Sequence, residues 1–297
     1  MTSSSASVTI DTKWFQASDG TSIFTRTWIP STEPKIVLCH LHGLGEHSGR
    51  YTPIFTQYAQ HGIKSYSFDQ RGFGETGRKS GTLGYNDGIK RVYADVDELL
   101  ARVKSEHPEL PIVLSGQSMG GGLALGYVVS KVTQSKPVDL AGIIAMSPFI
   151  LLPKETAPDP FTYWGGRILA PIVPSLPIKK VLDIRSISRV ESVRVDYLND
   201  PLNHQYISVG TGNDILSNGD NLHKSGYQHL HIPLCMAHGE ADIITSAPAT
   251  KDFFEKAPSQ TKVIKLIPDA VHELHNDLCR EDVIDFYTKF MLGLAAN

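Results

Sequence analysis

Short apolar runs that alternate with amphipathic stretches dominate the hydrophobic pattern of this chain. Each run ends near a glycine, proline, aspartate or serine, and helical patterns lie between most of them, notably at Val92–Ser105 and Leu123–Val132. Runs that are apolar on both faces and alternate with helices are typical of a mostly parallel sheet covered on both sides. The strands expected from this pattern are Ile36–Cys39, Lys64–Phe68, Ile112–Leu114, Ala141–Met146, Leu234–Ala237 and Val263–Ile267.

The beginning of the chain follows a different pattern. Two stretches, Thr12–Ala17 and Thr21–Ile29, flank an Asp19-Gly20 pair, and the second alternates apolar and polar residues. Asp-Gly between two such runs favours a hairpin, and the alternation favours a strand with one wet face. We therefore expect an antiparallel hairpin at the edge of the sheet.

The alternation of strands and helices is interrupted between Phe149 and Leu230. This segment has many prolines up to Pro177, then mixed polar sequence and a patch rich in glycine and asparagine at Gly210–Asn221, and the rhythm resumes at Pro233. We interpret residues 149–230 as a cap inserted over a core formed by residues 1–148 and 231–297. The alternatives are a separate small domain or simply more helices.

Composition and charge exclude several classes of function. The formal net charge of −3 provides no basic surface field, so we expect no nucleic-acid partner. The histidines lack metal-ligand spacing such as HExxH, and three cysteines, Cys39, Cys235 and Cys279, do not form a disulfide framework pattern. The first ten residues lack the basic start and apolar stretch of a secretory signal. These features predict a cytoplasmic protein without a metal or an organic cofactor.

The motif Gly116-Gln-Ser118-Met-Gly120 carries the main chemical signal. It follows the predicted strand at Pro111–Ser115 and precedes the helical pattern that starts at Leu123, which gives the order strand, sharp turn, helix. This context is the one that a GxSxG nucleophile requires, because the serine must stand exposed on a strained turn above the sheet. Side chains at positions 116 and 120 would collide with neighbouring backbone. We expect Ser118 to be a nucleophile that becomes transiently acylated.

A serine nucleophile needs a base, and the base needs an orienting acid. In this architecture the chain order is serine, acid, histidine, with the acid and the histidine on loops that follow later strands. The strand at 233–237 leads to Asp242, with Glu240 as the alternative acid, and the last strand leads to His272, with His275 as the alternative base. We expect Asp242 and His272 to complete the triad.

The developing oxyanion needs backbone N–H donors. One donor should be the residue after the nucleophile, Met119. The other should lie in the loop that follows the strand at 36–41, which reads His42-Gly43-Leu44-Gly45, and we nominate the N–H group of Leu44.

Several of these stretches resemble the monoacylglycerol lipases, including the fungal ones, over nearly the whole chain. The most specific match is the run from His42 to Tyr51, HGLGEHSGRY, and further matches are Gly116–Gly122, Gly239–Asp242 and Val271–His275. The resemblance implies an α/β-hydrolase fold and hydrolysis of monoacylglycerols to glycerol and fatty acid. It also implies a triad of Ser118, Asp242 and His272, oxyanion donors at Leu44 and Met119, and glycerol contacts from Glu46, Arg50, Tyr197 and His275.

The resemblance further implies an apolar cap that touches a membrane or lipid-droplet surface and leads to an acyl tunnel. The apolar run Ile168–Ile178 falls in the matching region, and its 11 residues are too few for the roughly 20 of a spanning helix. Packing of this run on the core is the alternative. Other functions possible on the same scaffold are a lysophospholipase, a general carboxylesterase, a serine peptidase and a non-catalytic ligand-binding protein.

Overall fold

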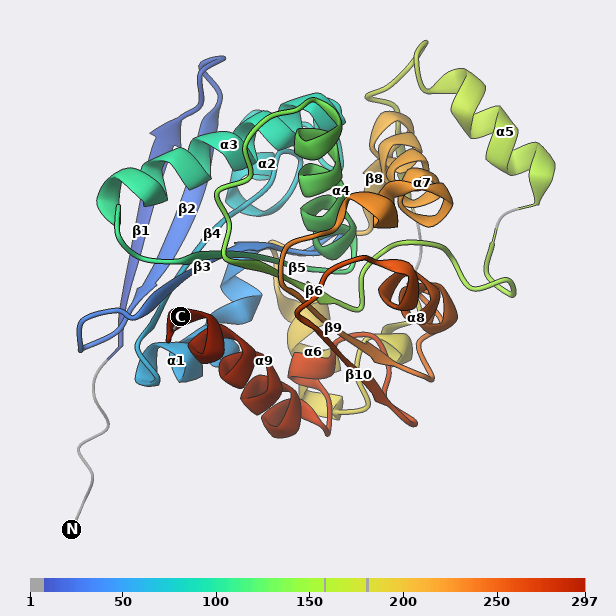
Figure 1. Ribbon diagram of the computed structural model, residues 1–297. Coiled ribbons are helices and arrows are strands. Elements are labelled where there is room, and N and C mark those ends of the chain that lie inside the picture. Colours follow the sequence, from blue (N-terminus) through green and yellow to red (C-terminus); the bar gives the residue numbers. More distant parts are fainter. Residues whose placement is uncertain (1–7, 158, 180–181, 297) are drawn as a thin grey trace.

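The apolar runs of the sequence become the strands of an eight-stranded sheet (Figure 1). The computed structural model describes residues 8–157, 159–179 and 182–296. The sheet has the order β1-β2-β4-β3-β5-β6-β9-β10, in which β2 is antiparallel to β1 and to β4 and the other pairs are parallel. The predicted edge hairpin and the predicted parallel strands are therefore confirmed. The strands are β1 (Thr9–Gln16), β2 (Ser22–Ile29), β3 (Ile36–Leu41), β4 (Ile63–Phe68), β5 (Ile112–Gln117), β6 (Gly142–Met146), β9 (Leu234–Gly239) and β10 (Lys262–Ile267).

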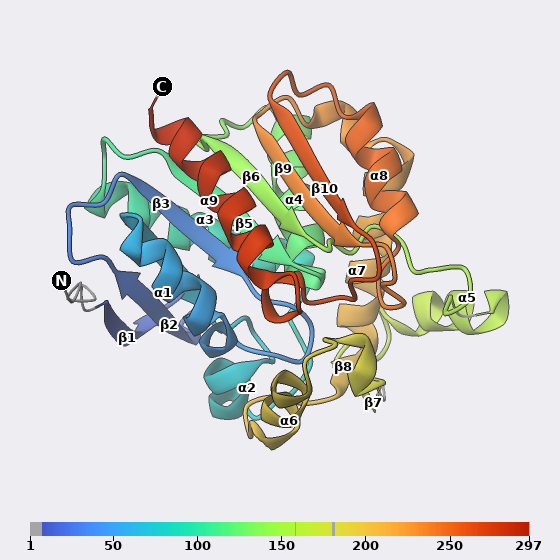
Figure 2. The same cartoon turned by 90° about the horizontal axis from the view of Figure 1, so that it is seen from below.

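Helices cover both faces of the sheet, as expected. On one face, α1 (Thr52–Gln60) and α9 (Arg280–Ala295) bury one apolar cluster, and Figure 2 shows both helices in front of the strands. On the other face, α3 (Ile89–Glu106), α4 (Met119–Thr133) and α8 (Ala247–Lys256) bury a second cluster. Strands β3, β5 and β6 are buried along their whole length. The short helix α2 (Gly74–Ser80) lies between β4 and α3.

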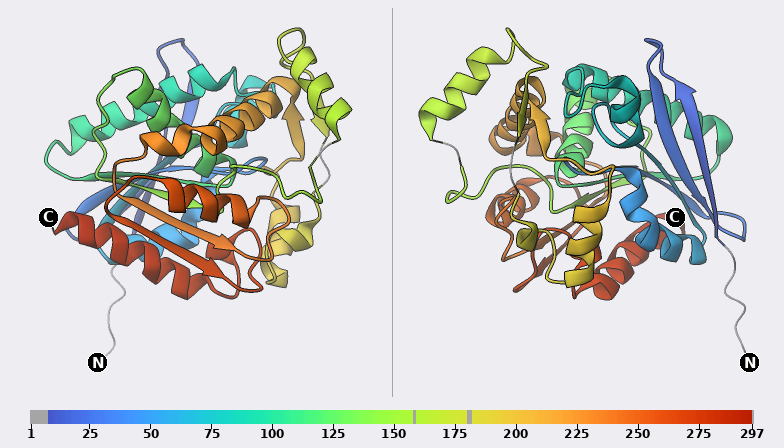
Figure 3. Two further views of the ribbon diagram at one scale, coloured as in Figure 1. Left: turned by 45° about the vertical axis from the view of Figure 1, so that its right-hand side comes forward. Right: turned by 180° about the vertical axis from the view of Figure 1, so that it is seen from behind.

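The segment 149–230 contains α5 (Pro160–Leu169), α6 (Glu191–Asn199), α7 (Val209–Lys224) and two short antiparallel strands, β7 (Pro177–Lys179) and β8 (Tyr206–Ser208). Helix α5 lies at the outer edge of the molecule, where Arg167 pairs with Asp220 of α7, and α7 lies against α4 (Figure 3). Short 3-10 helices connect these parts and the core loops: η1 (Ser48–Tyr51), η2 (Ile184–Ser186), η3 (Gly226–His229) and η4 (Leu274–Asn276). In the described ranges, none of the helices combines the length and the apolar character needed to cross a bilayer.

Helix α7 contains the patch rich in glycine and asparagine at Gly210–Asn221, for which the sequence pattern gave no clear helix. The Ser208 side chain accepts a hydrogen bond from the Thr211 N–H group and caps the helix, and Ile215 and Leu222 are buried. A Cβ atom at Gly219 would lie 2.2 Å from the Ile150 carbonyl oxygen, so glycine is needed where the helix meets the core. Tertiary packing thus outweighs the weak helix propensity of glycine and asparagine.

Candidate active site

Ser118 lies on the sharp turn between β5 and α4. Its backbone has φ 55° and ψ −117°, a region that non-glycine residues rarely adopt. A Cβ atom at Gly116 would lie 2.1 Å from the Gly120 carbonyl oxygen, and one at Gly120 would lie 2.0 Å from the Leu41 carbonyl oxygen. The two glycines are therefore required for the strained turn that presents the serine at the carboxyl end of the sheet.

His272 and Asp242 are hydrogen-bonded, with 2.6 Å between His272 Nδ1 and Asp242 Oδ2. Asp242 also accepts hydrogen bonds from the N–H groups of Ile244 and Thr245. Since the carboxylate faces Nδ1, that nitrogen carries the proton and Nε2 can act as a base. Glu240, the alternative acid, is exposed.

Burial and charge set the protonation of this pair. Burial disfavours the charged form of Asp242, but the charge of His272 and hydrogen bonds from His238 and His272 outweigh it and hold the pKa of the carboxyl well below its usual range. Burial also lowers the pKa of His272, but the Asp242 carboxylate outweighs it, and the net result is a raised pKa. The pair therefore favours an imidazolium stabilised by a carboxylate.

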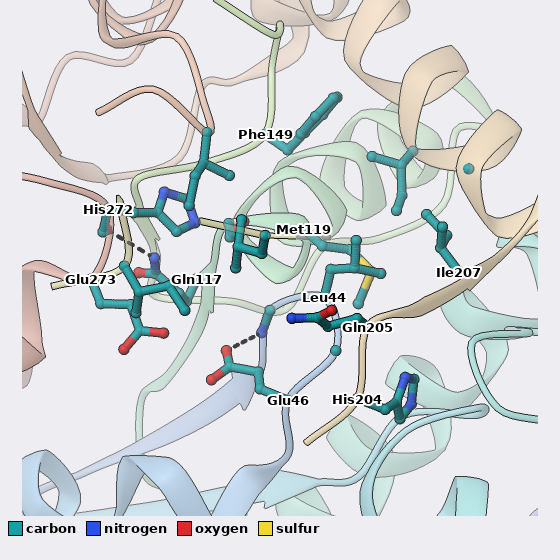
Figure 4. Close-up of a pocket in the computed structure, with 18 of the residues that line it drawn as sticks. Leu44, Glu46, Gln117, Met119, Phe149, His204, Gln205, Ile207, His272 and Glu273 are labelled. Carbon is teal, nitrogen blue, oxygen red and sulfur yellow. Dashed lines mark hydrogen bonds between the residues drawn. The ribbon is translucent and has the colours of Figure 1, made fainter. Parts of the chain in front are cut away.

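Ser118 and His272 line the same cavity. The Gln117 side-chain amide donates a hydrogen bond of 3.1 Å to the His272 carbonyl oxygen, which ties the nucleophile turn to the histidine loop (Figure 4). Among the described residues, the Ser118 hydroxyl forms no hydrogen bond with His272. A serine–histidine contact is often long before substrate binds, so this separation is compatible with proton transfer.

The two nominated oxyanion donors, Leu44 and Met119, belong to loops that line this cavity (Figure 4). Gly43, which precedes Leu44, approaches the nucleophile closely, since a Cβ atom on it would lie 3.5 Å from Ser118 Cβ. Met119 is the first residue of α4, so its N–H group is one of the unpaired donors at a helix start. Leu44 and Met119 thus line the same cavity as Ser118.

The cavity has a volume of about 420 Å³ and is lined by both apolar and polar side chains. Figure 4 shows Phe149 well apart from Glu46 and Glu273. The apolar lining residues, called the apolar side below, are Phe149, Leu152, Ile178, Leu182, Ile187, Ile207, Ile215, Leu216 and Ile244, and the polar side denotes Glu46, Arg50, Tyr197, His204, Gln205 and Glu273.

Three of the residues expected to contact glycerol, Glu46, Arg50 and Tyr197, lie on the polar side of the cavity. The fourth, His275, does not line the cavity. Its side chain is 2% exposed, stacks on Tyr51 with 5.0 Å between ring centroids, and has no hydrogen-bond partner in the described part of the chain. Burial lowers the pKa of His275 to about 4. The structure therefore separates His275 from the other three residues.

Sequence reasoning missed Glu273 and His238. Both Glu273 carboxylate oxygens bind Arg50, at 2.6 and 2.7 Å, and His238 Nε2 lies 3.1 Å from Asp242 Oδ2. Glu273 directly follows the predicted base, and His238 is the penultimate residue of β9, four positions before the predicted acid. Proximity in sequence to predicted residues was therefore an available signal. In the described ranges, no group of three or more His, Cys, Asp or Glu side chains could hold a metal ion.

Comparison with known proteins supports a hydrolase scaffold. The family model described as serine aminopeptidase, S33, matches residues 32–279. An abhydrolase domain-containing protein of Dictyostelium discoideum is 31% identical over 92% of the chain, which spans only 28% of that protein. A putative monoglyceride lipase of Schizosaccharomyces pombe is 31% identical over 85% of the chain and 66% of its own length.

A solved structure shows the same fold. A soluble variant of the Saccharomyces cerevisiae monoglyceride lipase, in complex with a substrate analogue, superposes with a TM-score of 0.85. It is 23% identical, and the match covers 96% of this chain and 95% of the yeast chain. The fold is therefore the α/β-hydrolase fold.

Proposed function

We propose that this chain, which belongs to the serine aminopeptidase S33 family, hydrolyses the ester bond of monoacylglycerols to glycerol and fatty acid. The observation that carries this proposal is the Asp242–His272 pair, whose histidine lines the same cavity as Ser118, a serine on a strained turn. The apolar and polar sides of that cavity suit an acyl chain and a small hydroxylated head group. The relatives named as monoglyceride lipases agree with this choice of substrate.

The proposed reaction begins with acylation of Ser118. His272 Nε2 accepts the hydroxyl proton while the serine oxygen attacks the ester carbonyl carbon. The N–H groups of Leu44 and Met119 donate hydrogen bonds to the oxygen that becomes negative. Asp242 keeps the proton on Nδ1 and stabilises the imidazolium.

The second half of the reaction releases the products. The His272 imidazolium gives its proton to the departing glycerol oxygen, which leaves an acyl group on Ser118. A water molecule then loses a proton to His272 and attacks the acyl carbonyl, and the fatty acid leaves as the serine regains its proton. Ser118, His272 and the attacking water molecule together account for every proton that is transferred in this scheme.

The cavity suggests how the substrate lies. The acyl chain would follow the apolar side, where burial of each CH₂ group is worth about 0.8 kcal/mol. The glycerol would lie at the polar side, near Glu46, Arg50 and Tyr197. The Tyr197 hydroxyl has no protein hydrogen-bond partner within the described ranges, so it is available to a glycerol hydroxyl.

The apolar run of the cap supports contact with a lipid surface. Its six large apolar side chains, together with that of Trp164, are 37–69% exposed, whereas Ala170 is buried, so most of the run does not pack on the core. An exposed apolar patch of this kind is typical of interaction surfaces, and we propose that it contacts a membrane or a lipid droplet. The patch, called the cap patch below, consists of Trp164, Ile168, Leu169, Ile172, Val173, Leu176 and Ile178.

A substrate panel tests the proposed function. Wild type and Ser118→Ala would be assayed on monoolein, lysophosphatidylcholine and a short-chain nitrophenyl ester. We expect the highest kcat/KM on monoolein and a loss of several orders of magnitude in the variant on every substrate. A preference for lysophosphatidylcholine would instead assign a lysophospholipase, and a preference for the nitrophenyl ester a general carboxylesterase. Activity of Ser118→Ala within tenfold of wild type would refute the nucleophile.

A further inference from the structure

Arg50 bridges two carboxylates that belong to different catalytic loops. Its Nη1 atom donates to Glu46 Oε2 at 2.5 Å and to Glu273 Oε1 at 2.6 Å, and its Nη2 atom donates to Glu273 Oε2 at 2.7 Å. The three side chains are almost completely buried, and Figure 4 shows both glutamates at the same end of the cavity. An ion pair in such a buried place is strongly coupled, because removal of one partner leaves an uncompensated charge.

Through Glu46, this bridge reaches the loop that carries the Leu44 N–H group. Glu46 Oε1 accepts hydrogen bonds of 2.6 Å from the Gly43 N–H group and from the Tyr51 hydroxyl. Because the other oxygen binds Arg50, both carboxylate oxygens already have protein donors. Glu46 is therefore placed to hold the turn at Gly43 as well as to face the cavity.

The Gly43 carbonyl group, which belongs to the next peptide together with the Leu44 N–H group, is held by His42. The Gln70 N–H group donates to His42 Nε2 at 2.9 Å, so Nε2 is unprotonated and Nδ1 carries the proton. His42 Nδ1 then donates to the Gly43 carbonyl oxygen at 2.8 Å. The peptide that joins Gly43 to Leu44 is thus oriented by His42, and the N–H group of Gly43 by Glu46.

Through Glu273, the bridge reaches the base. Glu273 directly follows His272, and its N–H group donates to the Ile187 carbonyl oxygen at 2.8 Å. Its Oε2 atom also accepts a hydrogen bond from the Asn276 side chain at 2.9 Å. The backbone beside His272 is therefore attached to Arg50 by a bidentate ion pair, the strong geometry for an arginine and a carboxylate.

We propose that Arg50 is a positioning residue that sets the distance between the Leu44 oxyanion donor and the His272 base. This inference rests on the proposed hydrolysis at Ser118, but it concerns every ester, whatever the alcohol. Displacement of a reacting group by about 1 Å can lower a rate by about 100-fold, and removal of an oxyanion donor lowers kcat by about 100- to 1,000-fold. Loss of the bridge should therefore act on kcat.

The test compares two esters that differ in their alcohol. Arg50→Ala and Arg50→Lys would be assayed on monoolein and on a nitrophenyl ester, which has no glycerol. We expect kcat to fall about 10- to 100-fold on both substrates for Arg50→Ala, with KM on the nitrophenyl ester within about twofold, and a partial rescue by lysine. If Arg50 serves only to bind glycerol, the nitrophenyl ester rate stays within twofold of wild type, and the proposal is overturned.

A double-mutant cycle separates positioning from general damage. Glu273→Gln keeps the volume of the side chain but weakens the bridge, so we expect a smaller fall in kcat on both esters. In the Arg50→Ala background, Glu273→Gln should lower kcat little further. If the two residues had independent roles, the fold-decreases in kcat of the two single variants would multiply in the double variant. A multiplicative fall in kcat would contradict the bridge. If Arg50→Ala does not fold, the same cycle can be measured with Arg50→Lys and Glu273→Gln.

A matched control is Arg71→Lys. Arg71 is another buried arginine, with its Nε atom 2.7 Å from Asp95, and it does not line the cavity. We expect this variant to lower the melting temperature without changing kcat of the folded enzyme, so a fall in kcat equal to that of Arg50→Lys would overturn the proposal.

The proposed substrate and the proposed role of Arg50 can be refuted separately. A preference for another ester would refute monoacylglycerol hydrolysis, but the effect of Arg50→Ala on the nitrophenyl ester would still test the positioning role.

Discussion

His272 Nδ1 lies 2.6 Å from Asp242 Oδ2, and the two residues are brought together from the loops that follow β10 and β9. Neighbouring parallel strands end at the same edge of a sheet, so residues 30 positions apart in the chain meet there. This contact determines which imidazole nitrogen is basic. It also determines the pH at which the base loses its proton.

We predict that Asp242→Asn lowers kcat by about four orders of magnitude, because asparagine can favour the wrong imidazole tautomer. The Asp242 charge also raises the pKa of His272 against the opposing effect of burial. The wild-type kcat/KM should therefore fall as the pH falls through a pKa above 6.5, and the acidic limb should move to lower pH in the variant. Residual rates measured between pH 5 and 9 check both effects, and an acidic limb that does not move would contradict the electrostatic assignment.

We predict that His275 makes the protein less stable in acid. Its folded-state pKa of about 4 lies below the usual 6.5, so the unfolded chain binds a proton that the folded chain does not. Stability from this group is full above pH 6.5 and is lost as the pH falls towards 4, with about 2 kcal/mol lost between pH 7 and pH 5.

The measurement is urea unfolding at pH 7 and pH 5 for wild type and His275→Phe, which keeps a ring against Tyr51. The decrease in the free energy of unfolding between the two pH values should be smaller in the variant by about 2 kcal/mol. Equal decreases in the two proteins would show that His275 titrates normally in the folded state.

We predict that Tyr197→Phe weakens the preference for a glycerol ester. Tyr197 lines the cavity, and its hydroxyl lies 3.7 Å from where a Cβ atom on Gly45 would be. Loss of one hydrogen bond to a neutral ligand costs about 0.5–1.5 kcal/mol. The ratio of kcat/KM on monoolein to that on the methyl ester of oleic acid should fall about two- to tenfold. The methyl ester has the same acyl chain, so an unchanged ratio would place glycerol elsewhere.

We predict that Ile172→Asp weakens binding to lipid vesicles. Ile172 is 69% exposed in the cap patch, and a charge there removes apolar area and opposes insertion among lipid chains. Co-sedimentation with phosphatidylcholine vesicles should show at least a fivefold weaker association, whereas hydrolysis of a soluble nitrophenyl ester should stay unchanged.

Leu278→Asp is the matched control for the cap patch, since Leu278 is 70% exposed but lies outside residues 149–230. It should bind vesicles as wild type does. Equal losses in the two variants would show that the cap patch is not the surface that meets the lipid.

Local patterns were sufficient for the sheet, the edge hairpin and the Ser118 turn, because hydrophobic period and glycine requirements act over a few residues. They gave no clear signal at α7, because Gly210–Asn221 has weak helix propensity and its helix is stabilised by packing on α4. The pattern offered His275 as the alternative base, and the resemblance to monoacylglycerol lipases implied that it contacts glycerol, although its ring lies buried against Tyr51. No local pattern distinguishes a histidine that faces a cavity from one that is buried behind it.

The order of chemical groups along the chain determined the fold class, the turn at Ser118 and the candidate acid and base, because each depends on short-range sterics or on the order of strands. The sequence already favoured Asp242 over Glu240, but only the tertiary structure shows its contact with His272. Likewise, only the tertiary structure joined Arg50 to Glu273, which lies 223 residues further along the chain. Such contacts depend on how two separate loops meet at the edge of the sheet. Their energies come from burial and pairing, which exist only once the chain is folded.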